Sequence, residues 1–289
     1  MGNRHLYQTR GQLQTNFMAL RFLLIWRTAP GTGGGVNPWD RFWASRASAD
    51  DFYPQHERIE WAVRDAGTWD RRVAVEVGCG LGGSARFMLD LGMKPVLLDY
   101  SQASLDKCRE RFPAGSGVAL VRGDVFHLPF KDECVDLIFH QGLIEHFRGQ
   151  EPRAILLENL RTLKSCGWLV VEVPQAFHWE GVLARPFIWT GTWFAGWQTY
   201  YTFPGLKRLA ESLDIEKIRY FGMWMNPSFC YRALRWGLRR FFSLPLYPWS
   251  WGPTERLRRG LRRRFFYHPI AWWTGASVGF VGRKKRGGS

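Results

Sequence analysis

Apolar and polar positions alternate in two distinct patterns along the central part of the chain. Short runs of Val, Leu and Ile are separated by longer stretches in which apolar residues recur with helical spacing. The first pattern is typical of buried strands and the second of amphipathic helices. The predicted strands are 73–77, 95–99, 118–122, 135–140 and 168–173, and the predicted helices between them are 83–91, 102–111 and 152–164. This alternation predicts an α/β fold with a doubly wound sheet.

The regions on either side of this alternation carry further elements. Residues 6–27 have the spacing of a helix and precede a glycine-rich joint, so residues 1–54 are predicted to form an N-terminal helical extension or lid. Residues 55–289 are predicted to form one domain. After the alternating region, a helix is expected over 205–213 and strands over 215–221 and 276–282.

Acidic side chains mark the ends of the first three predicted strands. Glu76 precedes the turn Gly78-Cys-Gly-Leu-Gly-Gly83, Asp99 ends the second strand, and Asp124 follows the third. Open α/β sheets bind ligands beyond the carboxyl ends of their strands, and glycines allow a ligand to approach the backbone. The pattern indicates a nucleotide-like cofactor, although the turn also matches the dinucleotide pattern G-x-G-x-x-G. Each acid alone would equally suit a helix N-cap or a turn.

The positive charge of the chain is concentrated near its C-terminus. The formal net charge is +15, and residues 219–289 hold fifteen Lys or Arg against a single acid, Glu255. The five cysteines are widely spaced and include no C-x-x-C pair, so neither a metal site nor a disulfide framework is predicted. These observations favour a reducing, cytoplasmic setting and an anionic partner for the C-terminal part.

Five motifs together resemble the class I S-adenosylmethionine-dependent methyltransferases, in particular the type-11 group of small-molecule and lipid methyltransferases. The motifs are Val75–Gly82, Leu98–Ser101, Gly123–Phe130, Asp136–Phe147 and Leu163–Leu169. Ser165 and Cys166 depart from the Pro-Gly that is usual in the last motif, which affects only a turn. The resemblance covers roughly residues 55–175. It implies a Rossmann-like, mostly parallel seven-stranded sheet with an antiparallel last strand, and S-adenosylmethionine as cofactor.

The resemblance also implies roles for individual residues. The implied cofactor-binding residues are Glu76, Gly78, Gly80, Gly82, Asp99, Tyr100, Asp124, Val125 and Gln141. In this family the glycines let the backbone pass the methionine part of the cofactor, with the acid of the first strand below them. Asp99 would hold the ribose hydroxyls with Tyr100 beside the adenine. Asp124 and Val125 would meet the adenine edge, and Gln141 would lie at the methionine end.

Methyl transfer to a hydroxyl also needs a base, because the hydroxyl proton must leave. The titratable side chains near the expected site are His140, Glu145, His146 and His178. We name His146 and His178 as the candidate catalytic residues. A structural role is the alternative for each of the four, because Glu-His-Phe after the fourth strand is frequent in the family and need not be catalytic.

Two segments outside the cofactor motifs are candidates for choosing the substrate. Residues 175–203 are rich in aromatic residues and almost uncharged, which indicates a lid over an apolar acceptor or a small satellite core. Residues 222–274 form an insertion before the last strand and contain two predicted basic amphipathic helices, 228–242 and 254–266. The aromatic residues of 244–251 lie between these helices and are of the type enriched at membrane interfaces.

The second basic helix is compatible with three interpretations of the insertion. Its apolar positions 257, 261 and 265 are set against arginines at 258, 259, 262 and 263. Such helices fit an anionic membrane surface. They would also fit nucleic acid, which the wide apolar faces make unlikely, or they would simply cover the edge of the sheet with solvated arginines.

We therefore expect a cytoplasmic methyltransferase that lies peripherally on the inner face of a membrane. Its acceptor would be an apolar or lipid-linked small molecule, of the quinone, isoprenoid or lipid-linked glycan type. The alternatives are a soluble methyltransferase for a secondary metabolite or sugar, a nucleic-acid-binding methyltransferase, and a non-catalytic cofactor-binding module. The sequence alone indicates neither the acceptor atom nor the oligomeric state.

Overall fold

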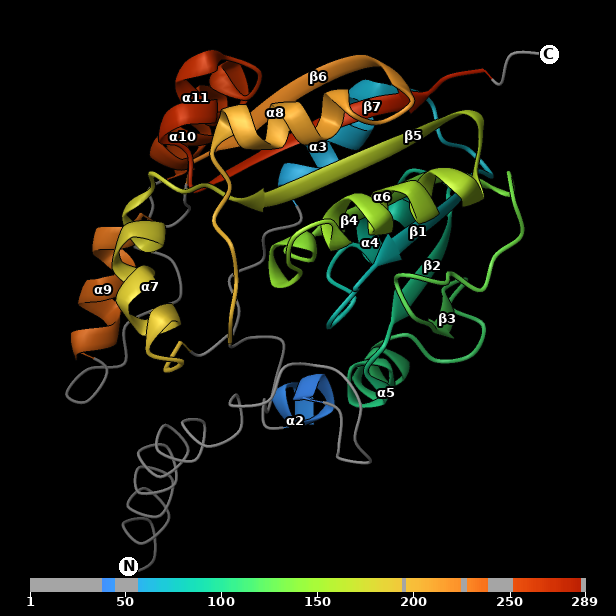
Figure 1. Ribbon diagram of the computed structural model, residues 1–289, viewed down its shortest axis with the longest axis horizontal. Helices are drawn as coiled ribbons and strands as arrows, with labels where there is room; N and C mark the ends of the chain where they lie inside the picture. Colours follow the sequence, from blue (N-terminus) through green and yellow to red (C-terminus); the bar gives the residue numbers. More distant parts are fainter. Residues whose placement is uncertain (1–37, 45–56, 194–195, 225–227, 239–251, 287–289) are drawn as a thin grey trace, which may run out of the picture.

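The computed structural model describes residues 38–44, 57–193, 196–224, 228–238 and 252–286 (Figure 1). The strands in this part of the chain are β1 (Val73–Val77), β2 (Lys94–Asp99), β3 (Ala119–Arg122), β4 (Val135–Gln141), β5 (Leu163–Pro174), β6 (Ile215–Met223) and β7 (Ser277–Lys284). They form one sheet in the order β3-β2-β1-β4-β5-β7-β6. Only β7 runs antiparallel to its neighbours. The predicted doubly wound, mostly parallel sheet of seven strands is confirmed.

Helices cover both faces of this sheet. They are α2 (Pro38–Ala44), α3 (Glu57–Ala66), α4 (Ala85–Asp90), α5 (Gln102–Arg111), α6 (Glu151–Thr162), α7 (Trp179–Trp189), α8 (Phe203–Glu211), α9 (Phe229–Leu238), α10 (Gly252–Phe265) and α11 (Pro269–Thr274), with a short 3-10 helix η2 (Ile144–His146). Successive strand residues point to opposite faces, so Ala74 packs with α3, α4 and α5 whereas Val75 packs with α6 and α8. The runs are apolar because both faces are buried.

The parallel register brings the carboxyl ends of three strands together at one end of the sheet. Glu76 of β1 pairs with Leu97 of β2 and with Phe139 of β4. The last residues of these strands, Asp99 and Gln141, therefore lie at the same end as the turn that follows β1. The sheet thus positions the predicted cofactor residues before any side-chain contact is considered.

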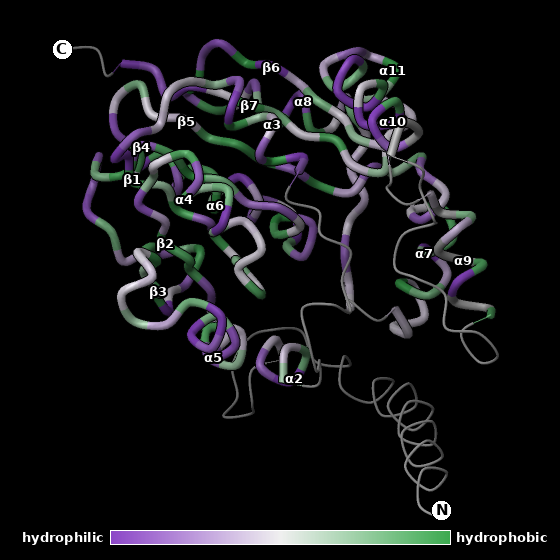
Figure 2. Tube along the Cα trace, turned by 180° about the vertical axis from the view of Figure 1, so that it is seen from behind, coloured by the Kyte–Doolittle hydropathy of each residue, from purple (hydrophilic) through white to green (hydrophobic). Residues whose placement is uncertain are grey.

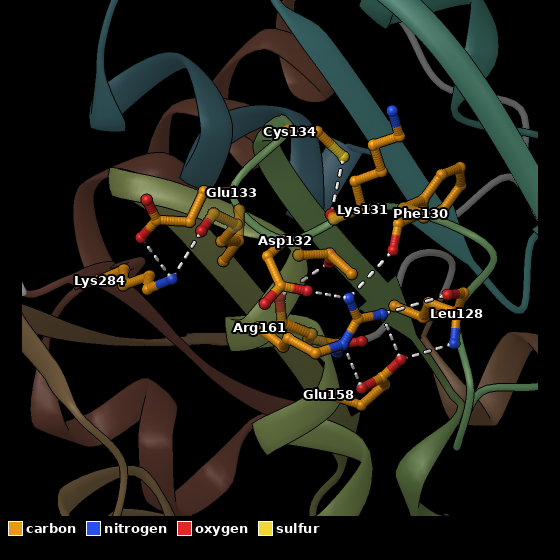
Figure 3. A network of polar contacts seen from close by, with 12 residues as sticks. Leu128, Phe130, Lys131, Asp132, Glu133, Cys134, Glu158, Arg161 and Lys284 are labelled. Atoms are coloured by element: carbon orange, nitrogen blue, oxygen red, sulfur yellow. Dashed lines mark hydrogen bonds and ion pairs between the residues drawn. The ribbon is translucent and has the colours of Figure 1, made fainter.

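At the opposite end of the sheet, where β4 begins, a network of ion pairs holds the loop before this strand (Figure 3). Arg161 at the end of α6 donates to the carboxylates of Glu158 and Asp132 and to two backbone carbonyls of the loop before β4. Lys284 of β7 donates to Glu133 of the same loop. These contacts fix the start of β4 and lie away from the carboxyl ends of the strands.

Some element boundaries and one helix differ from the sequence-based expectations. Helix α6 ends at Thr162 and β5 begins at the next residue, whereas the predicted helix ran to residue 164 and the predicted strand began at residue 168. Val135, the first residue of β4, already pairs with Leu163, and an irregularity in the register follows between Val135 and Leu137. The aromatic segment after β5 contains α7, which its continuous apolar character did not reveal. The predicted helix 6–27 and the aromatic segment 244–251 lie outside the described residues.

Candidate active site

The turn after β1 requires glycine at three alternate positions. Gly78, Gly80 and Gly82 have φ angles of +71°, +52° and +65°, a region that side chains disfavour. A Cβ on Gly82 would also lie 2.7 Å from Leu97 Cδ1. Gly83 has no positive φ and no atom within 4 Å of such a Cβ. The geometry therefore selects Gly78, Gly80 and Gly82, and the dinucleotide pattern that uses Gly83 has no structural counterpart.

Asp99 holds this turn against the end of β2. Its Oδ2 accepts a hydrogen bond from the backbone N–H of Gly80 and its Oδ1 accepts one from Ser101, each at 2.9 Å. The side chain is 7% exposed. Burial raises the pKa of Asp99, and the backbone N–H groups of Ser101 and Gly80 oppose that shift. Each carboxylate oxygen keeps a second lone pair, so Asp99 is oriented to accept hydrogen bonds from a diol such as a ribose.

Glu76 contributes a second buried carboxyl group below the glycine turn. Its Oε1 accepts a hydrogen bond from Ser84 Oγ at 2.9 Å, while its buried Oε2 has no partner among the described residues. Burial raises the pKa of Glu76 to about 8, and the negative charge of Asp99 adds to the shift. A buried carboxylate oxygen without a partner carries a desolvation cost that a hydrogen-bond donor or a cation would offset. This unpaired oxygen and the Cβ-free turn together fit a cofactor with a cationic amino-acid part.

Helix α2 lies over the turn, although it is remote in sequence. The carboxylate of Asp40 accepts hydrogen bonds from Ser101 Oγ at 2.6 Å and from the backbone N–H of Ala103 at 3.1 Å. The indole of Trp43 is so close to Gly80 that a Cβ there would lie 2.8 Å from it. The sequence analysis assigned this helix only to the predicted N-terminal extension, residues 1–54. Asp40 carried no signal, because its partners lie about sixty positions away.

Glu172 organises the end of β4. Arg58 of α3 donates to Glu172 Oε1 at 2.6 Å, and Gln141 Nε2 donates to Glu172 Oε2 at 2.5 Å. Both Arg58 and Glu172 are buried. A buried ion pair is stable only when its remaining atoms are hydrogen-bonded, and here the amide of Gln141 completes the pair. Gln141 is thereby fixed next to the cofactor turn, and sequence reasoning missed the two residues that fix it.

Two titratable residues of η2 lie shortly after the end of β4. Glu145 is buried, and burial raises its pKa to about 8, with the charge of Glu172 adding to the effect. His146 Nδ1 lies 3.2 Å from the carbonyl oxygen of Trp197, and its ring meets the edge of Trp39 with 4.9 Å between centroids. Burial lowers the pKa of His146 to about 4. At neutral pH the site therefore presents a protonated carboxyl and a neutral imidazole.

The other predicted residues have well-defined places. His140 lies within β4 and is fully buried, which lowers its pKa to about 3. His178 forms the N-cap of α7, where Nδ1 accepts the N–H of Glu180 at 3.3 Å. Tyr100 is half exposed directly after Asp99.

The loop after β3 lies beside Asp99. The backbone N–H of Gly123 donates to the carbonyl of Asp99 at 3.1 Å. Asp124 Oδ1 accepts the N–H of Phe126 at 3.0 Å, and Val125 is buried. The structure therefore places Asp124 and Val125 in the loop beside Asp99.

A cavity of about 330 Å³ opens next to η2. It is lined by Phe147, Arg148, Gly149, Pro152, Trp197, Thr199 and Tyr201. The guanidinium of Arg148 lies 4.2 Å from the ring centroid of Trp197, a cation–π geometry. The backbone N–H of Thr199 donates to the carbonyl of Glu145 at 2.7 Å, which joins the wall of the cavity to η2. Among the described residues, no group of three or more His, Cys, Asp or Glu is arranged to bind a metal ion.

Comparison with known proteins assigns this arrangement to a family. Residues 75–171 match the family described as "Methyltransferase domain", and this range contains the turn, Asp99, Gln141 and η2. The chain carries a class I S-adenosylmethionine-dependent methyltransferase domain. When bound, S-adenosylmethionine supplies an electrophilic methyl group. In this methyltransferase domain the glycine turn, Glu76 and Asp99 would hold it.

Individual relatives and structures agree with this assignment. A protein of Mycolicibacterium smegmatis named "Probable S-adenosylmethionine-dependent methyltransferase" is 31% identical over 131 residues, 45% of this chain and 48% of that protein. The phthiotriol/phenolphthiotriol dimycocerosates methyltransferase of Mycobacterium tuberculosis is 34% identical over 100 residues, 32% of this chain and 34% of that protein. The chain thus spans at most about half of the length of these relatives.

A solved structure shows the same fold over most of the chain. The phosphoethanolamine N-methyltransferase 2 of Haemonchus contortus, solved with S-adenosyl-L-methionine, superposes with a TM-score of 0.56 at 16% identity. The superposition covers 88% of this chain and 62% of that protein. The similarity extends beyond the family match to the strands and helices that follow β5, so the methyltransferase fold includes β6 and β7.

Proposed function

We propose that this chain transfers the methyl group of S-adenosylmethionine to an apolar or lipid-linked small molecule at a membrane surface. The acceptor would be of the quinone, isoprenoid or lipid-linked glycan type. One observation carries the proposal: the chain that leaves the carboxyl end of β5, beside the cofactor residues, exposes large aromatic side chains. Phe177, Trp179, Phe187 and Trp189 are all more than half exposed. Exposed apolar patches of this kind mark sites that bind apolar ligands, membranes or other proteins.

The relatives support an apolar acceptor. The Mycobacterium tuberculosis relative is named as a methyltransferase of phthiotriol and phenolphthiotriol dimycocerosates, which makes it a lipid methyltransferase. The similarity is confined to about a third of each chain, so it supports the type of chemistry more than the identity of the acceptor. We accordingly place the chain in the cytoplasm, peripherally on the inner face of the membrane, as part of the same proposal.

The residues of η2 fit acceptors that lose a proton on methylation. A neutral His146 with Nδ1 toward the carbonyl of Trp197 leaves Nε2 as a proton acceptor when Nδ1 carries the hydrogen. Burial lowers the pKa of His146 to about 4, so the ring is neutral throughout the physiological range and is a weaker base than an exposed histidine. Glu145 is protonated at neutral pH and is suited to donate a hydrogen bond. We propose His146 as the base for this step.

A mass-spectrometric experiment tests the proposal. Membrane lipid extract and soluble extract are each incubated with the full chain and S-adenosylmethionine carrying a labelled methyl group. We expect label in a species of the lipid extract and none with an Asp99→Ala variant. Label confined to the soluble extract would replace the proposal with a soluble methyltransferase. Binding of S-adenosylmethionine without any labelled product would indicate a non-catalytic cofactor-binding module.

The cavity next to η2 favours a second candidate, a soluble methyltransferase for a secondary metabolite or sugar. Its lining combines the aromatic faces of Trp197 and Tyr201 with the cation of Arg148. Such a mixture suits a polar, partly planar molecule better than a lipid chain. Substitution of Arg148 by Met separates the two candidates, because it should weaken the use of a polar acceptor and leave that of a lipid acceptor unchanged.

A further inference from the structure

The exposed apolar residues of the described chain are concentrated on a few helices. Apart from Tyr100 and Leu157, every large apolar side chain with high exposure lies in 177–189, on α9, on α10 or on α11. These helices gather on one side of the molecule, where β5 ends (Figures 1 and 2). Scattered apolar residues on a surface need no explanation, but a collection on adjacent elements does.

Helix α7 turns its apolar face outward. Trp179, Val182, Leu183 and Phe187 follow helical spacing and are exposed, with Trp179 at 69%. The buried residues of α7 are Gly181, Ala184 and Ile188, and the first two are small. A Cβ on Gly181 would lie 2.7 Å from the ring of Tyr200, so the helix packs tightly through this side. Its large side chains therefore remain in contact with water.

Helix α10 is reversed in the same way, because its arginines face the protein. Arg259 and Arg262 approach Glu57 of α3 at 2.9 and 3.5 Å, and Arg263 pairs with Asp65 of the same helix. The opposite face exposes Leu257 and Leu261 to 65% and 46%.

The leucines of α10 are accompanied by free positive charge. Arg258 and Arg264 are exposed and have no ion pair with any described residue, whereas Arg256 lines the groove between α10 and α3 together with Glu60 and Asp65. The predicted opposition of leucines and arginines on this helix is thus real, but the acids of α3 bind part of the arginine face. Two leucines flanked by cations are left on the outside.

Ring contacts join these helices into one surface. Phe177, just before α7, stacks on Trp273 of α11 with 6.2 Å between centroids and an interplanar angle of 23°. Trp224 contacts the ring of Phe265 at the end of α10 and donates to Thr274 of α11 at 2.8 Å. Helix α11 adds exposed Ile270 and Trp273. The residues that line this outward surface are Phe177, Trp179, Leu183, Phe187, Leu257, Leu261, Ile270 and Trp273.

We propose that this outward surface of α7, α10 and α11 docks on an anionic lipid bilayer. The inference rests on the proposed function and deepens it by naming the partner and the face that meets it. The apolar side chains enter the interfacial region, as amphipathic helices do. The free arginines of α10 lie near the headgroups, where each basic residue contributes about 1 kcal/mol on an anionic leaflet.

Other occupants match the surface less well. A second copy of the chain, related by a two-fold axis, would bring the free arginines of α10 against one another. Nucleic acid would neutralise these arginines but leave the leucines and tryptophans exposed to water. A bilayer accommodates both kinds of group at the depths where they lie. Among the helices that the structure describes, none has the length and apolar character needed to cross a bilayer.

Docking through this surface would place the site at the membrane. Helix α7 follows the carboxyl end of β5, and Ser277, the first residue of β7 after α11, pairs with Pro174 and Met223 at that same end of the sheet. This end also carries Asp99 and Gln141. An acceptor molecule that leaves the bilayer would therefore reach η2 and the predicted cofactor residues without crossing bulk water.

Vesicle flotation of the full chain tests the proposal. The probes are vesicles of phosphatidylcholine alone and vesicles of phosphatidylcholine with phosphatidylglycerol. We expect flotation with the anionic vesicles, at least tenfold weaker partitioning for Leu257→Ser/Leu261→Ser and for Trp179→Ser/Phe187→Ser, and no change for the control Leu157→Ser on α6. The variant Arg258→Gln/Arg264→Gln should lose the preference for anionic vesicles. Wild-type chain that stays with the soluble fraction, or double variants that float as well as wild type, would overturn the proposal.

Two further readouts distinguish bilayer docking from self-association and from damage to the fold. Calorimetric titration with S-adenosylmethionine should give the same dissociation constant for wild type and both double variants, which shows that the fold and the donor site are intact. Methyl transfer that fails while flotation succeeds would reject the proposed function and keep the docking surface. A stable dimer in light scattering that dissociates in Leu257→Ser/Leu261→Ser would assign the surface to self-association instead.

Discussion

Arg263 of α10 donates both terminal nitrogens of its guanidinium to the two carboxylate oxygens of Asp65 on α3. The two residues are 198 positions apart in the chain. The same guanidinium lies 5.5 Å from the ring centroid of Trp61. Although burial opposes it, the pKa of Asp65 is held below its ordinary value by hydrogen bonds from Arg263 and Tyr267. This pair anchors the basic insertion to the catalytic domain.

Removal of this anchor should destabilise the protein measurably. We expect Arg263→Ala to lower the free energy of unfolding by about 1–2 kcal/mol, because it removes a bidentate pair that is partly exposed to solvent. Urea unfolding of Arg263→Ala, Asp65→Ala and the double variant gives the coupling energy between the two side chains. The control Arg258→Ala should change stability by less than about 0.5 kcal/mol. A coupling energy of zero would show that α10 is held by other contacts.

The two neighbouring glycines at the end of the turn should respond differently to alanine. Gly82→Ala places a Cβ at a φ of +65° and 2.7 Å from Leu97, and should cost about 1–3 kcal/mol of stability. Gly83→Ala meets open space without a positive φ and should be neutral or slightly stabilising. Thermal unfolding of the two variants makes the comparison. Equal losses would contradict the assignment of Gly82, instead of Gly83, to the cofactor turn.

The carboxylate of Asp99 should be needed for cofactor affinity. Asp99→Asn replaces an oxygen that accepts the N–H of Gly80 or Ser101 by an amide donor. We expect at least tenfold weaker binding of S-adenosylmethionine, equivalent to about 1.4 kcal/mol. Isothermal titration provides the measurement, with Asp106→Asn on the exposed side of α5 as control. Unchanged affinity in Asp99→Asn would remove Asp99 from the cofactor site.

Cofactor binding should release a proton from Glu76. Its pKa of about 8 means that the carboxyl is mostly protonated at pH 7. A cationic ligand next to the carboxyl favours the charged form, and so it lowers this pKa. Titration at pH 7 in buffers of different ionisation enthalpy should show net proton release in the wild type. It should show none in Glu76→Gln, and equal release in both would assign the proton elsewhere.

Glu145 should make the fold less stable as the pH rises. Its folded-state pKa of about 8 lies above the ordinary value of 4.5, so the folded state retains a proton that the unfolded state has lost between these two values. Stability therefore falls as pH increases through this window, with a slope of up to about 1.4 kcal/mol per pH unit for this group. Glu145→Gln should flatten the decline in urea unfolding between pH 6 and pH 8. An unchanged slope in that variant would show that Glu145 ionises freely.

The tertiary structure decided the orientation of α10. The sequence correctly predicted a helix with leucines on one face and arginines on another. It did not show which face meets the protein, because amphipathicity gives the relative positions of side chains and not the surface opposite them. The acids Glu57 and Asp65 of α3 decide this, and they recruit arginines to the inside. The leucines are exposed as a consequence.

The sheet positions of the predicted cofactor residues followed from sequence, whereas the contacts made by several of their neighbours did not. The glycine turn, Glu76 and Asp99 lie at strand ends, and in a parallel sheet strand ends meet at one edge. Their grouping therefore required only the order of strands and helices. Arg58, Glu172 and Asp40 carry no local signal, because each functions through a partner more than fifty positions away. His178 was proposed from its position after β5, where it also caps α7.

The sequence by itself determined the strands, the doubly wound sheet and the glycine turn after the first strand, because short-range periodicity and glycine geometry are local properties of the chain. Only the tertiary structure decided how α2 covers the turn, which protons Glu76 and Glu145 retain, and which sides of α7 and α10 face solvent. These properties depend on desolvation and on pairing between distant segments, and both arise only when the segments pack together.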